Sequence, residues 1–293
     1  MQKKPLVTVI CLCYNHAEFV VETLNSVLNQ SYSNVELIIA DDCSTDDSVT
    51  VIENWRQQHP EVPFIKNEKN IGNTKTINQA FQYAKGDYLI DLAADDVLLS
   101  NCIAIQVRAF ETSDLDRLGI VYGNVENIRE DGSFDSYYYP IGSNGKVISK
   151  RNSGELYKEV ISGETICSVS SMIKRSVFEA LGGYDEHLAY EDFDFWVRAS
   201  RIYDIAFIDA ILVRKRITKT AMTKDFHSKR NIRARKMNHS TYLVIKKAIQ
   251  LNKTKEEDKA LLKRIHYEIL LNLKTRDFGL MAKLFWLKLK IRL

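Results

Sequence analysis

The sequence predicts an α/β fold, in which a sheet of mainly parallel strands is flanked by helices. Two observations predict it. Strand-like and helix-like segments alternate over residues 5–92, which is the order that builds parallel sheets. Paired aspartates follow two of the strand-like segments, and open α/β sheets bind their ligands beyond the carboxyl ends of the strands. The chain has 293 residues, 45% hydrophobic and 27% charged, which is ordinary for a globular domain.

The first predicted elements follow one another in a regular order. The strands are short apolar runs rich in β-branched residues, at residues 5–13, 34–40, 62–66 and 87–92. The helices repeat apolar residues every three or four positions and cover residues 18–30, a segment that ends near residue 58, and residues 73–85. Ser44 and Asp47 resemble a capping box at the start of the second helix.

The rest of the chain divides near residue 216. Residues 97–175 are less regular, with Asp131-Gly132 as a predicted hairpin turn. A further helix opens at Glu191, and the sequence from residue 217 onward is basic and mostly helical. We therefore expect one domain over residues 1–216 and a basic helical region over residues 217–293.

Charge and cysteine content argue against several classes of protein. Residues 1–209 carry a net charge of −14 and residues 210–293 one of +17, so the acidic body would repel a nucleic acid, and no motif of a nucleic-acid-binding protein is present. The five cysteines lack CxxC spacing and fit neither a disulfide framework nor a zinc ribbon, which favours a cytoplasmic location. The N-terminus does not resemble a signal peptide, and no apolar run is long enough to predict a spanning helix.

Paired aspartates are the strongest chemical signal. Asp41-Asp42 follows the second predicted strand, where a carboxylate accepts hydrogen bonds from a ribose or a base. Asp95-Asp96 follows the fourth strand, and adjacent carboxylates in a cleft favour a hard divalent cation such as Mg²⁺ or Mn²⁺. The alternative for each pair is a set of acids at a helix N-terminus.

Two weaker signals accompany the aspartates. Glu191, Asp192 and Asp194 open a predicted helix, where one carboxylate is a candidate general base; a solvated first helical turn is the alternative. The loop from Lys69 to Gly72, with Lys75 after it, is a candidate phosphate contact at a helix start, although it has no Walker spacing.

Taken in order, these motifs resemble the family 2 glycosyltransferases, of the type that builds bacterial polysaccharides, over about residues 5–215. The matching segments are Tyr14-Asn15, the DDCSTD motif from Asp41 to Asp46, Asn70-Ile71-Gly72, Asp95-Asp96, the GGYDE motif from Gly182 to Glu186, and the EDFDFWVR motif from Glu191 to Arg198. The resemblance implies the GT-A fold, a Rossmann-like mixed sheet with flanking helices.

The resemblance also implies the roles of individual residues. The nucleotide of a sugar donor, expected to be a UDP-sugar, would contact Tyr14, Asn15, Asp42, Lys75 and Asp95. Asp96 would hold Mn²⁺ or Mg²⁺. Asp192 would be the base that deprotonates the acceptor hydroxyl, in a single displacement that inverts the anomeric centre. Glu191 and Arg216 would lie near the acceptor or the diphosphate, and the acceptor would be a glycan or a lipid-linked sugar.

Two features qualify this resemblance. The metal motif of the family often reads Asp-x-Asp-Asp, and Ala93 replaces its first aspartate. The chain also lacks the Gln-x-x-Arg-Trp signature of processive synthases, which favours the addition of single sugars. The alternatives are a non-catalytic sugar-nucleotide-binding module of the same fold and a sugar-nucleotide pyrophosphorylase; a glycosidase would need a proton-donating carboxylic acid and no metal.

The last residues mix aromatic and basic side chains. The segment FGLMAKLFWLKLKIRL, residues 278–293, resembles basic sequences that bind anionic membrane surfaces. This pattern predicts a peripheral contact with the inner face of the plasma membrane. A homodimer contact is the alternative, and residues 287–293 alternate as a strand would.

Overall fold

The computed structural model describes residues 4–164, 166–218 and 231–292. The chain forms two compact units. The first comprises Met1–Gly154, Cys167–Tyr184 and Tyr203–Ile217, and the second comprises Glu155–Ile166, Asp185–Ile202 and Thr218–Leu293. In this division, the segments Glu155–Ile166 and Asp185–Ile202 group with the C-terminal helices. The predicted domain boundary at residue 216 stays a prediction.

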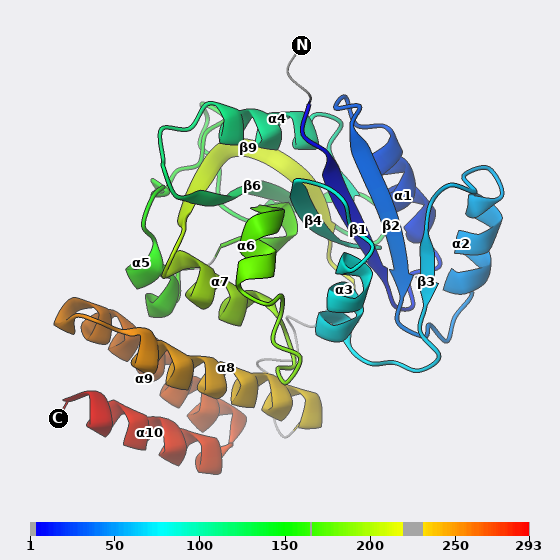
Figure 1. Cartoon of the computed structure of the whole chain (residues 1–293). Helices are drawn as coiled ribbons and strands as arrows, with labels where there is room; N and C mark the ends of the chain where they lie inside the picture. Colours follow the sequence, from blue (N-terminus) through cyan, green and yellow to red (C-terminus); the bar gives the residue numbers. More distant parts are fainter. Residues whose placement is uncertain (1–3, 165, 219–230, 293) are drawn as a thin grey trace. The chain divides into compact units, whose positions relative to one another are not determined.

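The first unit is built on one mixed sheet (Figure 1). Its strand order is β3-β2-β1-β4-β8-β6-β9-β5, and β7 pairs with β6 alone. The strands β1, β2, β3 and β4 run parallel, whereas β8 is antiparallel to both β4 and β6. The strands are β1 (Val7–Cys13), β2 (Val35–Asp41), β3 (Phe64–Lys66), β4 (Tyr88–Ala93), β5 (Val97–Leu98), β6 (Leu118–Ile128), β7 (Phe134–Tyr137), β8 (Met172–Lys174) and β9 (Asp204–Arg216).

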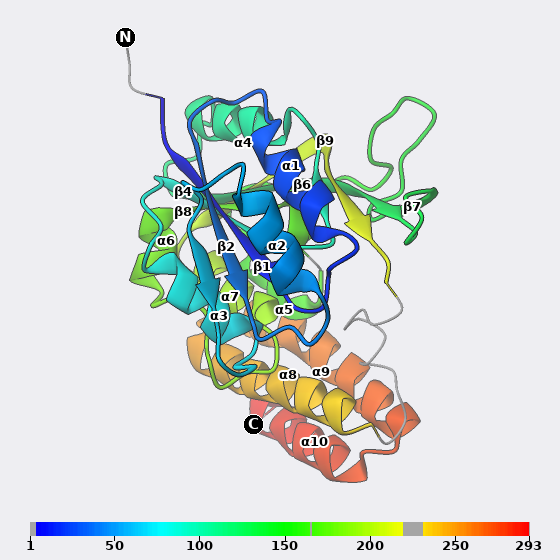
Figure 2. The same cartoon turned by 90° about the vertical axis from the view of Figure 1, so that its right-hand side faces the viewer.

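Helices cover both faces of the parallel part of this sheet. The helices α1 and α2 lie together on one face and α3 on the other (Figures 1 and 2). The helices therefore shield both faces of the parallel strands from water, and the sequences of these strands are mainly continuous apolar runs rather than alternating ones. The helices of the first unit are α1 (Val20–Leu28), α2 (Ser48–Arg56), α3 (Asn73–Phe81), α4 (Cys102–Glu111) and α6 (Arg175–Ala180), with a 3₁₀ turn at Ser168–Ser170.

The first four predicted strands and the three helices between them are confirmed to within a few residues. The predicted hairpin is also confirmed, because Gly132 has a φ of 82° and the turn joins β6 to β7. The capping box is wrong: α2 begins at Ser48, and its N-cap Asp47 makes no side-chain capping bond. Ser44 instead bonds to Asp41 and to the backbone N–H of Asn15.

The second unit is helical. It contains α5 (Tyr157–Ser162), α7 (Asp192–Ser200), α8 (Ile232–Leu251), α9 (Lys255–Thr275) and α10 (Phe278–Arg292). The predicted helical character of the C-terminal region is confirmed for its described residues. The strand-like alternation expected for residues 287–293 is wrong as far as residue 292, which ends α10; residue 293 lies outside the described residues. Thr254 begins α9 with a capping box, in which its hydroxyl accepts from the Glu257 N–H and the Glu257 carboxylate accepts from the Thr254 N–H.

Candidate functional site

The carboxyl ends of β1, β2 and β4 meet at one edge of the sheet. The strands are parallel neighbours, with Cys13 of β1 opposite Asp41 of β2 and Leu12 opposite Ala93 of β4. The chain leaving each strand therefore enters the same region. The structure brings Tyr14 and Asn15 together with both aspartate pairs, as expected from the sequence.

The turn after β2 is fixed by its own acids. Asp41 accepts hydrogen bonds from the backbone and the hydroxyl of Ser44. Asp42 is buried and accepts bonds from Asn67 Nδ2 at 3.0 Å and from the N–H groups of Ile71 and Gly72 at 2.8 Å each. The carboxylate of Asp42 thus shapes the loop before α3, and a nucleotide that bound Asp42 would share these oxygens.

Hydrogen bonds join the turn after β1 to the turn after β2. Asn15 has a left-handed backbone, with a φ of 59°, and its Oδ1 accepts a bond of 2.7 Å from the Thr45 N–H. The N–H of Asn15 donates to Ser44 Oγ at 2.9 Å. Asn15 therefore holds its loop in place, while the neighbouring Tyr14 leaves 43% of its surface exposed and offers a ring on which a base could stack.

Asp95 and Asp96 form a buried pair in the turn after β4. Their residues are 9% and 3% exposed. Burial raises the pKa of the Asp96 carboxyl well above its usual range, and the charge of Asp95 raises it further; Lys215 and the Arg216 N–H act in the opposite direction. Two ionised carboxylates in such a buried pair repel each other, and a bound cation would relieve that repulsion.

Arg216 holds this turn from the end of β9. Its N–H donates to Asp96 Oδ1 at 2.8 Å and its Nε to the Asp95 carbonyl at 3.2 Å. The guanidinium also bonds the carbonyls of Arg129 and Glu130 and the carboxylate of Glu22. At 4% exposure, Arg216 is committed to protein partners, so the geometry favours a positioning role over the predicted contact with acceptor or diphosphate.

Lys215 is a functional candidate that the sequence analysis did not single out. The charge of Lys215 lowers the pKa of Asp96, whereas the side chain of Arg216, the next residue, is buried among protein partners. The only sequence signal was the basic run Arg214-Lys215-Arg216, which does not say which side chain faces the acids.

The residues present fit a divalent ion bound mainly through its substrate. Among the described residues, no three or more His, Cys, Asp or Glu side chains gather into a complete metal-binding group, as the replacement by Ala93 implies. One oxygen of Asp96 accepts from the Arg216 N–H, which leaves its second oxygen and the Asp95 carboxylate. Mg²⁺ and Mn²⁺ sites commonly use one or two carboxylates and complete their shell with phosphates and water.

His16 adds an imidazole to the same turn. Its Nε2 lies 3.6 Å from Asp95 Oδ2. Its Nδ1 is buried without a hydrogen-bond partner among the described residues. His16 therefore brings an imidazole from the loop after β1 close to the Asp95 carboxylate.

A further carboxylate, that of the partly buried Asp91, lies within β4. Asp91 accepts a hydrogen bond of 3.2 Å from the Tyr184 hydroxyl, and Tyr184 is itself held by Asn78 of α3 through its N–H and carbonyl. Burial raises the pKa of Asp91 to about 7, while the bond from Tyr184 acts to lower it. The Gly-Gly-Tyr segment is thus tied to the strand that leads to Asp95-Asp96.

Lys75 lies in the first turn of α3, after Gly72, which has a φ of 89°. Its side chain is exposed and makes no hydrogen bond or ion pair with the described part of the chain. Lys75 is therefore available for the predicted phosphate contact, which stays a prediction.

The candidate base lies in the second unit. Glu191 is the N-cap of α7 and Asp192 its first residue. Asp192 Oδ1 accepts from the N–H of Phe193 at 2.6 Å, and both acids are partly exposed. The first turn is therefore acidic and accessible, as both the catalytic and the solvated interpretations require.

A network from α8 fixes the same helix. Asp194 is fully buried, accepts from Arg198 Nε at 2.6 Å and receives Lys247 Nζ at 2.6 Å. Lys247 also pairs with Asp185 of the GGYDE motif. The third acid of the motif is thus structural, and Lys247 links two of the motifs.

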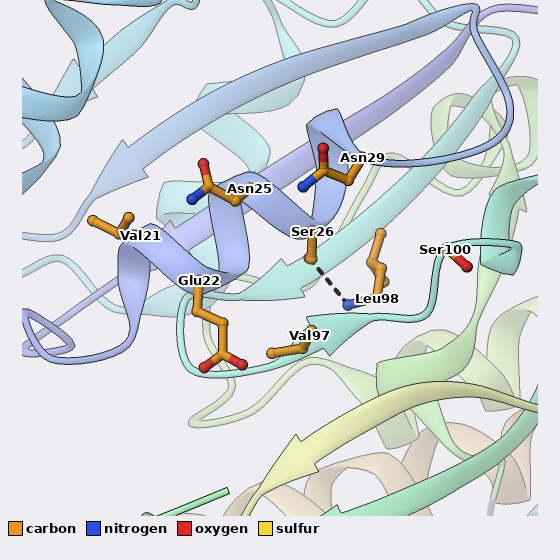
Figure 3. A pocket seen from close by; sticks show the side chains of 8 residues that line it. All are labelled: Val21, Glu22, Asn25, Ser26, Asn29, Val97, Leu98 and Ser100. Atoms are coloured by element: carbon orange, nitrogen blue, oxygen red, sulfur yellow. Dashed lines mark hydrogen bonds between the residues drawn. The ribbon is translucent and has the colours of Figure 1, made fainter.

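The described surface also has a pocket between α1 and β5 that none of the aspartates lines. Figure 3 shows its lining, which includes Glu22, Asn25 and Ser26 of α1. Ser26 Oγ accepts from the Leu98 N–H at 3.1 Å. None of the predicted site residues lines this pocket, although Glu22 binds Arg216.

Comparisons with known proteins agree with this geometry. The family described as Glycosyl transferase family 2 matches residues 8–182. The chain is 30% identical over 219 residues to an uncharacterised glycosyltransferase of Methanocaldococcus jannaschii, covering 73% of this chain and 71% of the relative. It is 28% identical over 214 residues to chondroitin synthase of Escherichia coli, covering 72% of this chain but only 29% of that protein.

Solved structures show the same fold. TarS from S. aureus in complex with UDP-GlcNAc matches 88% of this chain and 71% of its own, with a TM-score of 0.66 and 15% identity. The mannosyltransferase PcManGT from Pyrobaculum calidifontis, in complex with GDP-Man and Mn²⁺, matches 97% of this chain and 74% of its own, with a TM-score of 0.63 and 18% identity. The predicted GT-A fold is thereby confirmed. Among the described helices, none has the length and apolarity needed to cross a bilayer.

Proposed function

Because the chain belongs to glycosyl transferase family 2, we propose that it transfers a sugar from a UDP-sugar to a hydroxyl of a glycan or lipid-linked acceptor in cell-surface polysaccharide synthesis. The chain is a glycosyltransferase, so the pyrophosphorylase and the non-catalytic module are set aside. One observation carries the choice of a nucleotide donor: the loops after β1, β2 and β4 meet at one edge of the sheet and bring two aspartate pairs there.

The donor nucleotide is assigned to the β1–β2 side of this edge. The exposed ring of Tyr14 stacks on the base, and Asp42 accepts from the base or the ribose. Asn15 contributes by holding the Tyr14 loop. The structures of TarS with UDP-GlcNAc and PcManGT with GDP-Man support a nucleotide-sugar donor for this fold.

The diphosphate is assigned to the β4–β9 side. Asp96 and Asp95 would hold Mn²⁺ or Mg²⁺ there; when bound, such an ion neutralises the charge that develops on the leaving diphosphate. Lys215, whose charge acts on Asp96, and the exposed Lys75 add cationic contacts to the phosphates. No proton donor is needed for a leaving group of this kind.

The acceptor is activated by Asp192 in this proposal. A carboxylate that takes the proton of the acceptor hydroxyl raises its nucleophilicity as it attacks the anomeric carbon. One displacement, with the diphosphate leaving from the opposite side, inverts the configuration at that carbon. Glu191 supports Asp192 as the adjacent acid of the same turn.

Donor binding is tested by thermal unfolding with UDP, GDP, dTDP and CDP, each with and without Mn²⁺. A ligand at 100 times its Kd stabilises a protein by about 2.7 kcal/mol, which corresponds to an increase in Tm of about 4–5 °C for a chain of this length. The proposal expects that increase with UDP and Mn²⁺ together. An increase with GDP alone would move the donor to a GDP-sugar, and no increase with any nucleotide would contradict the proposed site.

A further inference from the structure

The C-terminal helix α10 is apolar on two opposite sides. Leu280, Leu284 and Leu287 are at most 5% exposed, and their spacing of four and three residues places them on one helical stripe. Figure 1 shows α10 beside α8 and α9, the helices that this stripe contacts. The inner stripe therefore belongs to the core of the second unit.

The outer side of α10 carries large apolar side chains as well. Phe278, Phe285 and Leu289 are separated by seven and four residues, which places them on one stripe opposite the buried leucines. Trp286 lies beside this stripe. These four side chains, the outer face of α10, are 57%, 53%, 47% and 55% exposed. Exposed apolar groups that cluster in this way mark interaction surfaces more often than singly scattered ones do.

Lysines border the outer face on both sides. Lys283 and Lys290 are seven residues apart and flank Trp286, and the Lys290 ammonium lies 3.6 Å from the centre of the Trp286 ring. Lys288 borders the other side, next to Phe285. The helix has no acidic residue. The outer face is thus an apolar strip with a positive margin.

This charge pattern selects the occupant. A second copy of the chain would bring one positive margin against another, which is unfavourable. An anionic lipid surface complements the lysines, while the interfacial region accepts the aromatic rings. At 15 residues, α10 is also too short to span a bilayer.

We propose that the outer face of α10 docks on an anionic lipid bilayer, with the helix parallel to the membrane plane. Phe278, Phe285, Trp286 and Leu289 enter the boundary between headgroups and acyl chains. Lys283, Lys288 and Lys290 lie at the level of the headgroup phosphates. This docking is independent of the transfer reaction and requires neither donor nor acceptor.

The test is co-sedimentation of the full chain with vesicles of phosphatidylcholine alone and of phosphatidylcholine with phosphatidylglycerol, without nucleotide. Binding is expected only to the anionic vesicles and is expected to weaken with salt. The double variant Lys283→Glu/Lys290→Glu should reduce the partition coefficient by at least roughly fivefold for each lysine. The matched control Lys259→Glu/Lys263→Glu, on exposed positions of α9, makes the same change in net charge away from the outer face.

A second readout follows the apolar side chains. Phospholipids brominated in their acyl chains should quench the fluorescence of the wild-type protein, and Trp286→Phe should lose that quenching while it still sediments. Phe285→Ser should lower binding, whereas Ile232→Ser, at an exposed position of α8, should not.

Three outcomes would overturn the proposal. One is equal binding of the α9 control and the α10 double variant, which would mean that net charge alone attracts the chain. Another is unchanged quenching in Trp286→Phe. The third is an absence of vesicle binding together with a concentration-dependent dimer that Phe285→Ser abolishes, which would assign the outer face to a second copy.

Discussion

At the scale of single residues, the site combines acids that shape loops with acids left for ligands. Hydrogen bonds from N–H and hydroxyl groups of nearby loops are accepted by the carboxylates of Asp41, Asp42 and Asp46. Asp95 and Asp96 keep more of theirs, and their burial makes a cation favourable. Asp42 therefore braces its loop and, in the proposed donor site, shares its oxygens with the nucleotide, whereas Asp95 and Asp96 are the candidate metal ligands.

The metal assignment predicts the behaviour of Asp96→Asn. The amide oxygen still accepts from the Arg216 N–H, so the turn is preserved while the charge is lost. The Mn²⁺-dependent part of the increase in Tm with UDP, which totals about 4–5 °C in the wild type, should disappear. Asp135→Asn, a change of the same kind in the β7 strand, should retain it. Retention of the Mn²⁺-dependent increase in Asp96→Asn would remove Asp96 from the metal site.

The base assignment predicts a different phenotype for Asp192→Asn. The substitution keeps the oxygen that accepts from Phe193 but cannot take a proton. Transfer should fall about 10²–10⁴-fold, with the Kd for donor unchanged in the same preparation. Glu256→Gln, an exposed acid at the start of α9, serves as the control. Transfer at the wild-type rate by Asp192→Asn would mean that another group accepts the proton.

Asp91 predicts a dependence of stability on pH. Because its pKa is raised to about 7 in the folded protein, the folded state holds a proton that the unfolded chain releases near pH 4. The free energy of unfolding should therefore fall as the pH rises from about 4 to 7. Asp91→Asn stays neutral throughout and should flatten this decline by up to about 4 kcal/mol.

Urea unfolding at a series of pH values measures this effect. Tyr184→Phe removes the hydrogen bond that favours ionised Asp91, so it should make the decline steeper. Parallel stability curves for the wild type and Asp91→Asn would show that Asp91 is ionised in the folded protein well below neutral pH.

At the scale of elements, Lys247 shows how one helix positions two motifs. From α8 it reaches Asp194 in α7 and Asp185 in the GGYDE motif. Lys247→Met would leave the buried Asp194 carboxylate with Arg198 as its remaining ionic partner. We expect a loss of about 1–3 kcal/mol in the free energy of unfolding.

Two variants separate this effect from a general loss of charge. Lys246→Met, the exposed neighbour on α8, should change stability by no more than about 0.5 kcal/mol. Lys247→Arg should recover part of the loss. Equal stability of Lys247→Met and the wild type in urea unfolding would mean that Arg198 alone satisfies Asp194.

At the scale of the whole molecule, the sequence predicted the parallel half of the sheet well. The strands β1, β2 and β4 are mostly buried and follow one another along the chain, so their apolar runs and the positions of Asp41, Asp42, Asp95 and Asp96 could be predicted from local sequence. The family motifs then identified the loops that follow these strands as the candidate site.

The remainder depended on contacts distant in the sequence. The long strand β9 pairs with β6 through an irregular register, and the contacts of Arg216 with Asp96 and Glu22 join residues far apart in the sequence. The capping box failed because Ser44 found a tertiary partner in Asn15. The sequence predicted a membrane contact for residues 278–293 but not which side chains of α10 would be exposed, because apolar residues on two opposite sides give no single amphipathic stripe.

The bonds of Arg216 have a consequence for biosynthesis. Its contacts with Asp96 and Glu22 join positions 120 and 194 residues apart, and contacts of such separation are slow to form. A chain emerging from the ribosome contains both aspartate pairs before the arginine that holds the second pair, which follows Asp96 by 120 residues. The turn that carries Asp95 and Asp96 therefore lacks its Arg216 contacts while those further residues are synthesised.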